Sequence, residues 1–399
     1  MQLPVLFHES YFTQFYGAQV GLYNFLQKID PEQFTSVVVC PAEGLFTQKI
    51  RQLGIEVKII PLPDKWLSFG GELLGLSLWE RMILSKDLLP QIRDLIRLIS
   101  ERNICLMHCN TIRSMVTSGW AAKFTRIPLV WHVKGEGSLG YLDQIAFLLS
   151  DRIIAISDDV RASLEKHTFW ESANKIVTIR DGIPLDKFNP DSCGKSVRQE
   201  FGFSQDNIVI GTVGSLSPRK RHDLFIEMAN LLAMENPHLR FLIIGDIPCQ
   251  EHSNYKEYLI DMAKDLLCDG RLVFAGWRDD MPQVYAAMDI FTLASAQEGL
   301  ALVVLEAMAM AKPVVRTLSA GAKETVEDGV TGYLVPVNDM PAMADAVRRL
   351  VTDREQCVQM GKAARNRTCS LFSTDRMARE IETVFLDCIL KGYRSGGIS

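Results

Sequence analysis

Residues 208–222 read Ile-Val-Ile-Gly-Thr-Val-Gly-Ser-Leu-Ser-Pro-Arg-Lys-Arg-His, and a helix-length segment follows from about Leu224. A β-branched run, a turn with glycine and a helix, in this order, are typical of one repeat of a parallel α/β sheet. Gly214 stands where the predicted strand ends, so the backbone there can approach a ligand closely. Arg219 and Lys220 follow in the turn and can bind an anion such as a diphosphate, with a solvated basic turn as the alternative.

The same alternation of strands and helices extends in both directions along the chain. The earlier strand-length runs cover residues 5–8, 36–40, 57–61, 105–109, 129–133, 153–156 and 176–179. The later ones cover residues 241–244, 272–275, 290–293, 314–316 and 332–335. The restart of the series at residue 208 predicts an α/β fold of two doubly wound, Rossmann-like domains. Their carboxyl-edge loops are expected to face each other across a cleft.

The limits of the domains follow from the turn-forming residues between the two series, which run from Asp181 to Asp191. We expect a first domain over residues 1–185, a linker over 186–200 and a second domain over 201–374. Apolar residues at a helical spacing predict a terminal helix over 375–392, which we expect to pack back on the first domain.

Composition narrows the classes of function. The chain has 399 residues, a formal charge of -5 and a pI of about 5.9, which argues against nucleic acid as a partner. Its nine cysteines are an odd number without a Cys-x-x-Cys pair, and we expect reduced thiols in the cytoplasm. The start of the chain reads as a strand and not as a signal peptide, and no apolar run reaches the ~18 residues that span a bilayer. Small molecules are the expected partners.

Residues 297–315, Gln-Glu-Gly-Leu-Ala-Leu-Val-Val-Leu-Glu-Ala-Met-Ala-Met-Ala-Lys-Pro-Val-Val, carry the strongest functional signal. The apolar segment from Ala301 to Ala311 predicts a helix that is buried around most of its circumference. Glu306 lies inside that helix and needs a partner or a function, because a buried charge is unfavourable. Glu298 lies at its start, where free N–H groups favour an anion. The alternative is that Glu298 only complements the helix dipole and that Glu306 lies on an exposed stripe of the helix.

Two residues of the first domain stand at predicted carboxyl edges of strands. His132 ends the run 129–133, where it can bind a sugar hydroxyl or a phosphate, with a purely structural histidine as the alternative. Gly17 follows the first strand and begins a helix, and a simple turn is equally consistent with its position. The glycine fingerprint of dinucleotide-binding enzymes is absent from this segment.

In these features the chain resembles the retaining glycosyltransferases of the GT-B fold, glycosyltransferase family 4. The resemblance covers both domains and is strongest from Gly211 to Val337. It rests on Val213-Gly-Ser-Leu-Ser-Pro-Arg-Lys220, Phe274-Ala-Gly276, Glu298 and Glu306 with seven residues between them, Pro313-Val-Val315, and the segment from Glu324 to Val335. The stretches 151–157 and 177–182 add weaker support.

The resemblance implies how a nucleotide-sugar donor is bound. Glu298 would hold hydroxyls of the donor sugar, Gly299 and Leu300 would offer backbone N–H groups, and Glu306 would bind the ribose hydroxyls. Lys220 would neutralise the diphosphate, and Trp277 would lie close to the base. His132 matches the family's histidine near the sugar, and Gly17 matches its glycine-rich loop near the phosphates.

The resemblance also implies transfer with retention at the anomeric carbon, with no metal and no cofactor other than the donor as co-substrate. His132 and Glu298 are the expected catalytic residues, and no protein nucleophile is assigned. The sequence departs from the family at Ser215, where an arginine is usual, so that Arg219 would have to replace it. It departs again at Ala311 and Ala320, where glycines are common.

The acceptor is expected to be a glycan, a lipid-linked sugar or a small molecule, as in polysaccharide or glycolipid biosynthesis. Residues 62–84 are apolar and rich in tryptophan and leucine. They are interpreted as core of the first domain, with peripheral contact to the inner membrane face as the alternative. Two other classes stay open, which are a non-catalytic nucleotide-sugar binding protein and a nucleotide-dependent dehydrogenase.

Overall fold

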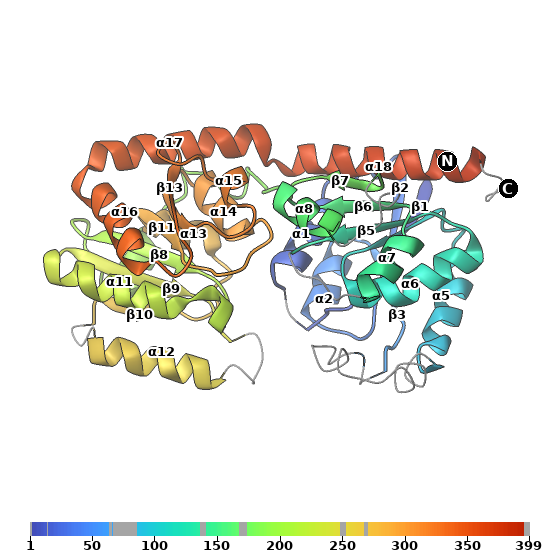
Figure 1. Cartoon of the computed structure of the whole chain (residues 1–399), viewed down its shortest axis with the longest axis horizontal. Coiled ribbons are helices and arrows are strands. Elements are labelled where there is room, and N and C mark those ends of the chain that lie inside the picture. Colours follow the sequence, from blue (N-terminus) through green and yellow to red (C-terminus); the bar gives the residue numbers. More distant parts are fainter. Residues whose placement is uncertain are drawn as a thin grey trace. The chain divides into compact units, whose positions relative to one another are not determined.

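The computed structural model describes residues 2–13, 15–63, 66, 86–135, 141–166, 174–247, 253–266 and 270–394. The chain divides into two compact units, of which unit 1 comprises Met1–Gly182 and Thr374–Ser399, and unit 2 comprises Ile183–Ser373. Each unit contains one parallel sheet with helices packed against it (Figure 1).

Unit 1 is built on a seven-stranded sheet in the order β3-β2-β1-β4-β5-β6-β7, in which all neighbouring strands are parallel. Its strands are β1 Leu3–His8, β2 Phe34–Cys40, β3 Glu56–Ile59, β4 Leu106–Cys109, β5 Leu129–Val133, β6 Arg152–Ala155 and β7 Ile176–Thr178. Its helices are α1 Gly17–Leu26, α2 Leu45–Gln52, α5 Leu89–Glu101, α6 Ile112–Thr125, α7 Tyr141–Leu149, α8 Asp158–Lys166 and α18 Thr374–Arg394.

Unit 2 is built on a six-stranded parallel sheet in the order β10-β9-β8-β11-β12-β13. Its strands are β8 Ile208–Val213, β9 Leu239–Ile244, β10 Leu272–Phe274, β11 Ile290–Leu293, β12 Val314–Thr317 and β13 Gly332–Val335. Its helical elements are α10 Lys195–Glu200, the 3-10 turn η2 Pro218–Lys220, α11 His222–Glu235, α12 Ser253–Leu266, α13 Met281–Ala287, α14 Leu302–Ala309, α15 Ala322–Thr325, α16 Met340–Thr352 and α17 Arg354–Leu371.

These two sheets confirm the predicted fold class. Every strand-length run recognised in the sequence forms a strand, and the alternation of strand and helix gives purely parallel pairing. The strands at the centre of each sheet are covered on both faces and are therefore almost continuously apolar, as in Val5 to Phe7 and Val209 to Ile210.

Helix α18 belongs to unit 1 although it ends the described chain (Figure 1). Its buried face includes Met377, Ile381 and Phe385, which recur at a helical spacing. The ring of Phe385 lies 6.1 Å from that of Phe7 and 5.8 Å from that of Phe25, measured between centroids. The amphipathic pattern of the sequence is thus satisfied by the core of this unit.

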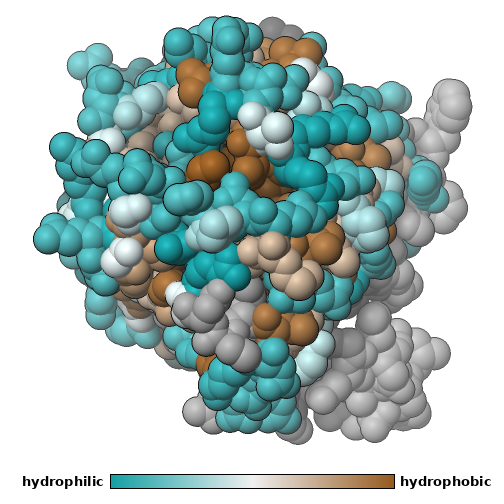
Figure 2. Space-filling model, turned by 90° about the vertical axis from the view of Figure 1, so that its left-hand side faces the viewer, coloured by the Kyte–Doolittle hydropathy of each residue, from teal (hydrophilic) through white to brown (hydrophobic). Residues whose placement is uncertain are grey.

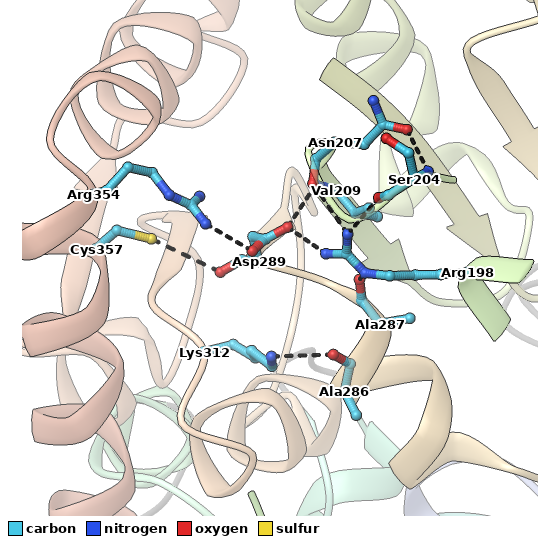
Figure 3. A network of polar contacts seen from close by, with 10 residues as sticks. All are labelled: Arg198, Ser204, Asn207, Val209, Ala286, Ala287, Asp289, Lys312, Arg354 and Cys357. Carbon is cyan, nitrogen blue, oxygen red and sulfur yellow. Dashed lines mark hydrogen bonds and ion pairs between the residues drawn. The ribbon is translucent and has the colours of Figure 1, made fainter. Parts of the chain in front are cut away.

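The segment 186–200, expected to form a linker, lies in unit 2 and includes helix α10. Asp289, which directly precedes β11, accepts hydrogen bonds from Arg198 at 2.7 Å, from the N–H of Val209 at 2.8 Å and from Arg354 at 3.0 Å (Figure 3). Arg198 also donates to the carbonyl oxygens of Ala287, Ser204 and Asn207. One partly buried guanidinium therefore connects α10 to the amino edge of the unit 2 sheet.

The surface of unit 2 is mainly hydrophilic where it is seen from the side of α11 and α16, with apolar side chains gathered in a hollow near the centre of that view (Figure 2). Exposed large apolar side chains such as Met234 and Val358 are ordinary on a protein surface. No helix within the described ranges is long and apolar enough to cross a membrane. Of the segment 62–84, only Leu62, Pro63 and Trp66 are described, and the first and last of these are buried.

Candidate functional site

The unit 2 site lies at the carboxyl edge of β8 and β11, the two adjacent strands at which the strand order reverses. Loops that leave such a pair of strands diverge to opposite faces of the sheet and leave a crevice between them. The loop after β8 contains Gly214 and Lys220, and the loop after β11 contains Glu298. The sheet topology therefore brings together residues that lie 78 positions apart in the sequence.

Lys220 and Glu298 form a buried ion pair at this edge. The Nζ atom of Lys220 lies 2.5 Å from Oε1 of Glu298, and only 10% and 7% of the two side chains are exposed. The sequence pointed to both residues but not to their contact. In the described structure the amino group of Lys220, which was expected to bind a diphosphate, is paired with the carboxylate of Glu298.

Burial opposes ionisation of both members of the pair. Burial raises the pKa of Glu298, but the charge of Lys220 and the hydrogen bond from it outweigh burial, so the pKa of Glu298 is lowered overall. Burial lowers the pKa of Lys220 despite its attraction to Glu298, and the charges of Arg219 and Arg316 lower it further. The pair is thus an ionised carboxylate held in a locally cationic environment.

The loops around this pair are fastened to each other through backbone atoms. The N–H of Ala296 donates to the carbonyl of Arg219 at 2.8 Å, and Thr317 Oγ1 donates to the carbonyl of Ser295 at 2.6 Å. Gly321 has a positive φ of 67°, and a Cβ atom there would lie 2.5 Å from the carbonyl oxygen of Gly299. The loops after β8, β11 and β12, which are neighbouring strands in the sheet, therefore hold the segment before α14 in one position.

Helix α14 is buried as the sequence predicted. Five of its side chains are fully buried, namely those of Val304, Leu305, Ala307, Met308 and Ala309. Its N-cap residue Ala301 has a positive φ of 59° and offers no side-chain cap, and Leu300 beside it is buried. The first N–H groups of this helix are thus left without a side-chain acceptor of their own.

Glu306 has a partner that the sequence did not indicate. The hydroxyl of Tyr285, on α13, donates a hydrogen bond of 2.7 Å to Oε2 of Glu306. Burial raises the pKa of Glu306 to about 7, against the effects of Tyr285 and of the charge of Lys187. This raised pKa agrees with the expectation that a charge on Glu306 inside an apolar helix is energetically unfavourable.

Glycines at the ends of β8, β9 and β10 form the other side of the site. The N–H of Gly245 donates to the carbonyl of Gly276 at 2.8 Å, and a Cβ on Gly245 would lie 2.0 Å from the carbonyl oxygen of Gly214. Gly276, with a φ of 64°, directs the chain into Trp277, which is 47% exposed. Arg219 is exposed and donates to the carbonyl of Gln297 at 3.4 Å, and Ser215 lies beside Ser217 at 3.3 Å.

In unit 1, the two expected site residues also lie at the carboxyl edge of the sheet. His132 is buried near the end of β5, and its Nδ1 lies 3.3 Å from Nε2 of His108 on β4. Burial lowers the pKa of His132 well below its usual value. Gly17 is exposed as the first residue of α1, and a Cβ there would meet no atom within 4 Å. The fold of unit 1 therefore does not itself require glycine at this position.

Three residues that act on the predicted site residues through a contact or a charge were not predicted from the sequence as part of the site, namely Tyr285, His108 and Arg316. Arg316 is fully buried on β12 and donates to Thr325 Oγ1 at 2.9 Å and to Ser319 Oγ at 3.1 Å. A charge at the end of an otherwise apolar strand is a signal that could have indicated Arg316. For Tyr285 and His108 no local signal exists, because their contacts with Glu306 and His132 join different elements.

Comparisons with known proteins bear on both units. The family model described as Glycosyltransferase Family 4 matches residues 16–187, and the one described as Glycosyl transferases group 1 matches residues 195–367. An Escherichia coli protein named UDP-Gal:alpha-D-GlcNAc-diphosphoundecaprenol alpha-1,3-galactosyltransferase is 25% identical over 93% of this chain and 94% of its own length. The Staphylococcus aureus capsular polysaccharide biosynthesis glycosyltransferase CapM is 24% identical over 84% of this chain and 91% of its own.

Solved structures show the same fold. The Anabaena protein Alr3699/HepE, in complex with UDP and glucose, has a TM-score of 0.81 at 23% identity, with 96% of this chain and 99% of that chain covered. A glycosyltransferase from Rickettsia africae has a TM-score of 0.82 at 18% identity, covering 97% and 99%. The dehydrogenase interpretation finds no support in these matches. The two family models and the paired parallel sheets show that the chain belongs to the family 4 glycosyltransferases of the GT-B fold and is a nucleotide-sugar-dependent enzyme.

Proposed function

We propose that this enzyme transfers a sugar from a nucleotide-diphosphate sugar to a hydroxyl acceptor with retention of anomeric configuration and without a metal ion. The observation that carries the proposal is the buried Lys220–Glu298 pair at the carboxyl edge of unit 2. A diphosphate bound beside it would be attracted by the charge of Lys220, and this attraction is stronger in a buried site than in water. A sugar bound beside it would meet the ionised carboxylate of Glu298, which accepts hydrogen bonds from hydroxyl groups.

The other donor contacts are proposed from the same arrangement. Gly299 and Leu300 would supply backbone N–H groups at the start of α14, and Arg219 would add charge at the diphosphate in place of the arginine that Ser215 replaces. Glu306 would accept hydrogen bonds from the ribose hydroxyls. Gly214 allows close approach of the phosphates, and the exposed ring of Trp277 would contact the base.

Catalysis would rest on stabilisation of the leaving group. The bond between the anomeric carbon and the diphosphate oxygen breaks while the acceptor oxygen forms its bond on the same face of the sugar. The acceptor's proton passes to the departing phosphate. Lys220 and the N–H groups before α14 would stabilise the charge that develops on the nucleoside diphosphate. His132 and Gly17 are proposed as further residues that bind the donor, His132 at the sugar and Gly17 near the phosphates.

The proposed acceptor is a sugar hydroxyl, and a lipid-linked glycan is the first to test. The name of the Escherichia coli relative, which is similar along nearly its whole length, specifies a diphosphoundecaprenol acceptor. A cytoplasmic enzyme that works at the inner membrane face would suit such an acceptor. The same name, together with the UDP complex of the Anabaena protein, makes UDP-sugars the first donors to test.

The test is incubation of the purified protein with UDP-, GDP- and ADP-sugars, with and without lipid-linked and free glycan acceptors. We expect release of free nucleoside diphosphate with one donor, an unchanged rate in EDTA, and an α-linked product from an α-linked donor. Glu306→Ala should abolish turnover with the circular dichroism spectrum unchanged, whereas Glu257→Ala on the exposed face of α12 should not. Inversion at the anomeric carbon, loss of activity in EDTA or full activity of Glu306→Ala would each contradict the proposal.

A further inference from the structure

Arg316 places a buried charge at the carboxyl end of β12. Its side chain is fully buried, and the strand lies between β11 and β13, where Arg316 is level with Leu293 and Leu334. A guanidinium stays protonated in proteins and carries five N–H donors in a fixed plane, so its burial is unfavourable unless oxygen atoms accept from it. The groups that accept these hydrogen bonds therefore indicate what Arg316 does.

Three acceptors of Arg316 belong to the loop that follows β12 and to the short helix α15. One terminal nitrogen of the guanidinium donates to Oγ1 of Thr325 at 2.9 Å. The other donates to Oγ of Ser319 at 3.1 Å and to the carbonyl oxygen of Ala320 at 3.3 Å. One rigid group thus holds both ends of the segment 319–325 to the end of β12.

Gly321, inside this segment, lies against the residues that precede α14. A Cβ atom on Gly321 would lie 2.5 Å from the carbonyl oxygen of Gly299 and 3.0 Å from the Cα atom of Leu300. The two backbones are therefore in direct contact. Because packed groups at this distance cannot interpenetrate, the position of the segment 319–325 determines where Gly299 and Leu300 lie.

A second arginine binds the same segment and allows a purely stabilising role to be separated from a positioning role. Arg367, on α17, donates to the carbonyl oxygens of Thr325 at 3.0 Å and of Glu324 at 2.8 Å. Both acceptors lie after Gly321, at the carboxyl end of α15. Arg316, by contrast, also binds the two residues that precede Gly321.

We propose that Arg316 is a positioning residue, whose hydrogen bonds to the segment 319–325 hold Gly321 against Gly299 and so fix the N–H groups of Gly299 and Leu300 before α14. This inference rests on the proposed function, in which those N–H groups bind the donor. The same guanidinium also acts on the ion pair of the site. Burial is the main cause that lowers the pKa of Lys220, and the charge of Arg316 acts in the same direction.

Hydrogen exchange of the full chain, followed by mass spectrometry, tests the contact without any substrate. Arg316→Met has no N–H donors, and exchange of the amides in residues 298–302 should become about tenfold faster, as expected for the loss of one or two hydrogen bonds. Arg316→Lys keeps donors and should reverse part of this change. Arg367→Met is the matched control and should leave residues 298–302 unaltered. Unaltered exchange in Arg316→Met, or the same increase in Arg367→Met, would overturn the proposal.

A smaller change keeps the test decisive if Arg316→Met does not fold. Ser319→Ala removes one acceptor of Arg316 and leaves the guanidinium in place. It should also speed up exchange in residues 298–302, by a smaller factor. Unaltered exchange in this variant would then refute the positioning role.

Kinetic measurements test the consequence for the donor. The kcat/KM of Arg316→Met should fall about tenfold for the UDP-sugar that gives turnover, with partial recovery in Arg316→Lys. Gly321→Ala should lower kcat/KM by a smaller factor in Arg316→Met than in the wild type, because both changes act on one contact. Equal factors in the two backgrounds would contradict the proposal. Absence of transfer by the wild-type protein would instead count against the proposed function, while hydrogen exchange still decides whether Arg316 positions Gly299.

Discussion

Replacement of Glu306 by glutamine is expected to stabilise the protein and to impair it as an enzyme. The carboxyl group has an ordinary pKa of 4.5, and burial raises it to about 7 in the folded protein. Between these two values the unfolded chain has lost the proton and the folded protein has kept it. The free energy of unfolding therefore falls as the pH rises through this interval, and the loss is complete above about pH 7.

The magnitude follows from the same two values. Each pKa unit corresponds to about 1.4 kcal/mol. Ionisation of Glu306 therefore lowers the free energy of unfolding by about 3 kcal/mol at pH 8 and by about 1.4 kcal/mol at pH 5.5. Glutamine has nearly the same shape, cannot ionise, and can still accept the hydrogen bond from Tyr285, which is 2.7 Å long. Glu306→Gln should therefore exceed the wild type in stability by about 3 kcal/mol at pH 8, and by about half of that at pH 5.5.

The measurement is urea denaturation of both proteins at several pH values, followed by circular dichroism. Glu257→Gln, an exposed substitution on α12, is the matched control and should leave the pH dependence unchanged. Donor turnover should fall about tenfold to a hundredfold in Glu306→Gln, since hydrogen bonds from two ribose hydroxyls to a charged acceptor are weakened. A variant that is no more stable than the wild type at pH 8, or a stability difference that does not vary with pH, would refute the reasoning.

Three further predictions concern substitutions in unit 2. Lys220→Met should lower the free energy of unfolding by about 3 kcal/mol, because it leaves Glu298 buried without its partner, and Lys220→Met with Glu298→Leu should recover most of this loss in urea denaturation. Gly321→Ala should lower the free energy of unfolding by about 2 kcal/mol and should lower kcat/KM, because the new Cβ would displace Gly299 before α14. Unaltered kinetics would show that this loop does not position the donor. Ala311→Gly should raise the melting temperature slightly, by relieving about 1 kcal/mol of strain at a φ of 56°, and a lowered melting temperature would contradict this.

Two residues, Ala311 and Ser215, differ from those that are common at these positions in the family. Ala311 stands where a glycine is common, and the structure places it in the left-handed region where glycine is favoured. The position is therefore recognisable from sequence, but the strain that alanine introduces there is visible only in the backbone. Ser215 remains a departure whose effect on the diphosphate only the donor assay decides.

The sequence by itself determined the strands, the helices and the two parallel sheets. Those features depend on local periodicity, since a covered parallel strand is a short β-branched run and its crossover helix carries one apolar face. It also determined which residues lie at the strand ends, including His132, Lys220 and Glu298, because the carboxyl edge of a parallel strand is where its turn begins.

Only the tertiary structure decided which of these residues meet. The contacts of Lys220 with Glu298, Tyr285 with Glu306 and His108 with His132 join elements that are 78, 21 and 24 residues apart. Strand order, strand register and the packing of helices set such contacts, and none of these can be read from the local pattern of either partner. The same holds for Arg198, whose hydrogen bonds to Asp289 and three carbonyls make residues 195–207 part of unit 2. Turn-forming residues show where a regular element ends, whereas the packing of side chains decides to which domain the segment belongs.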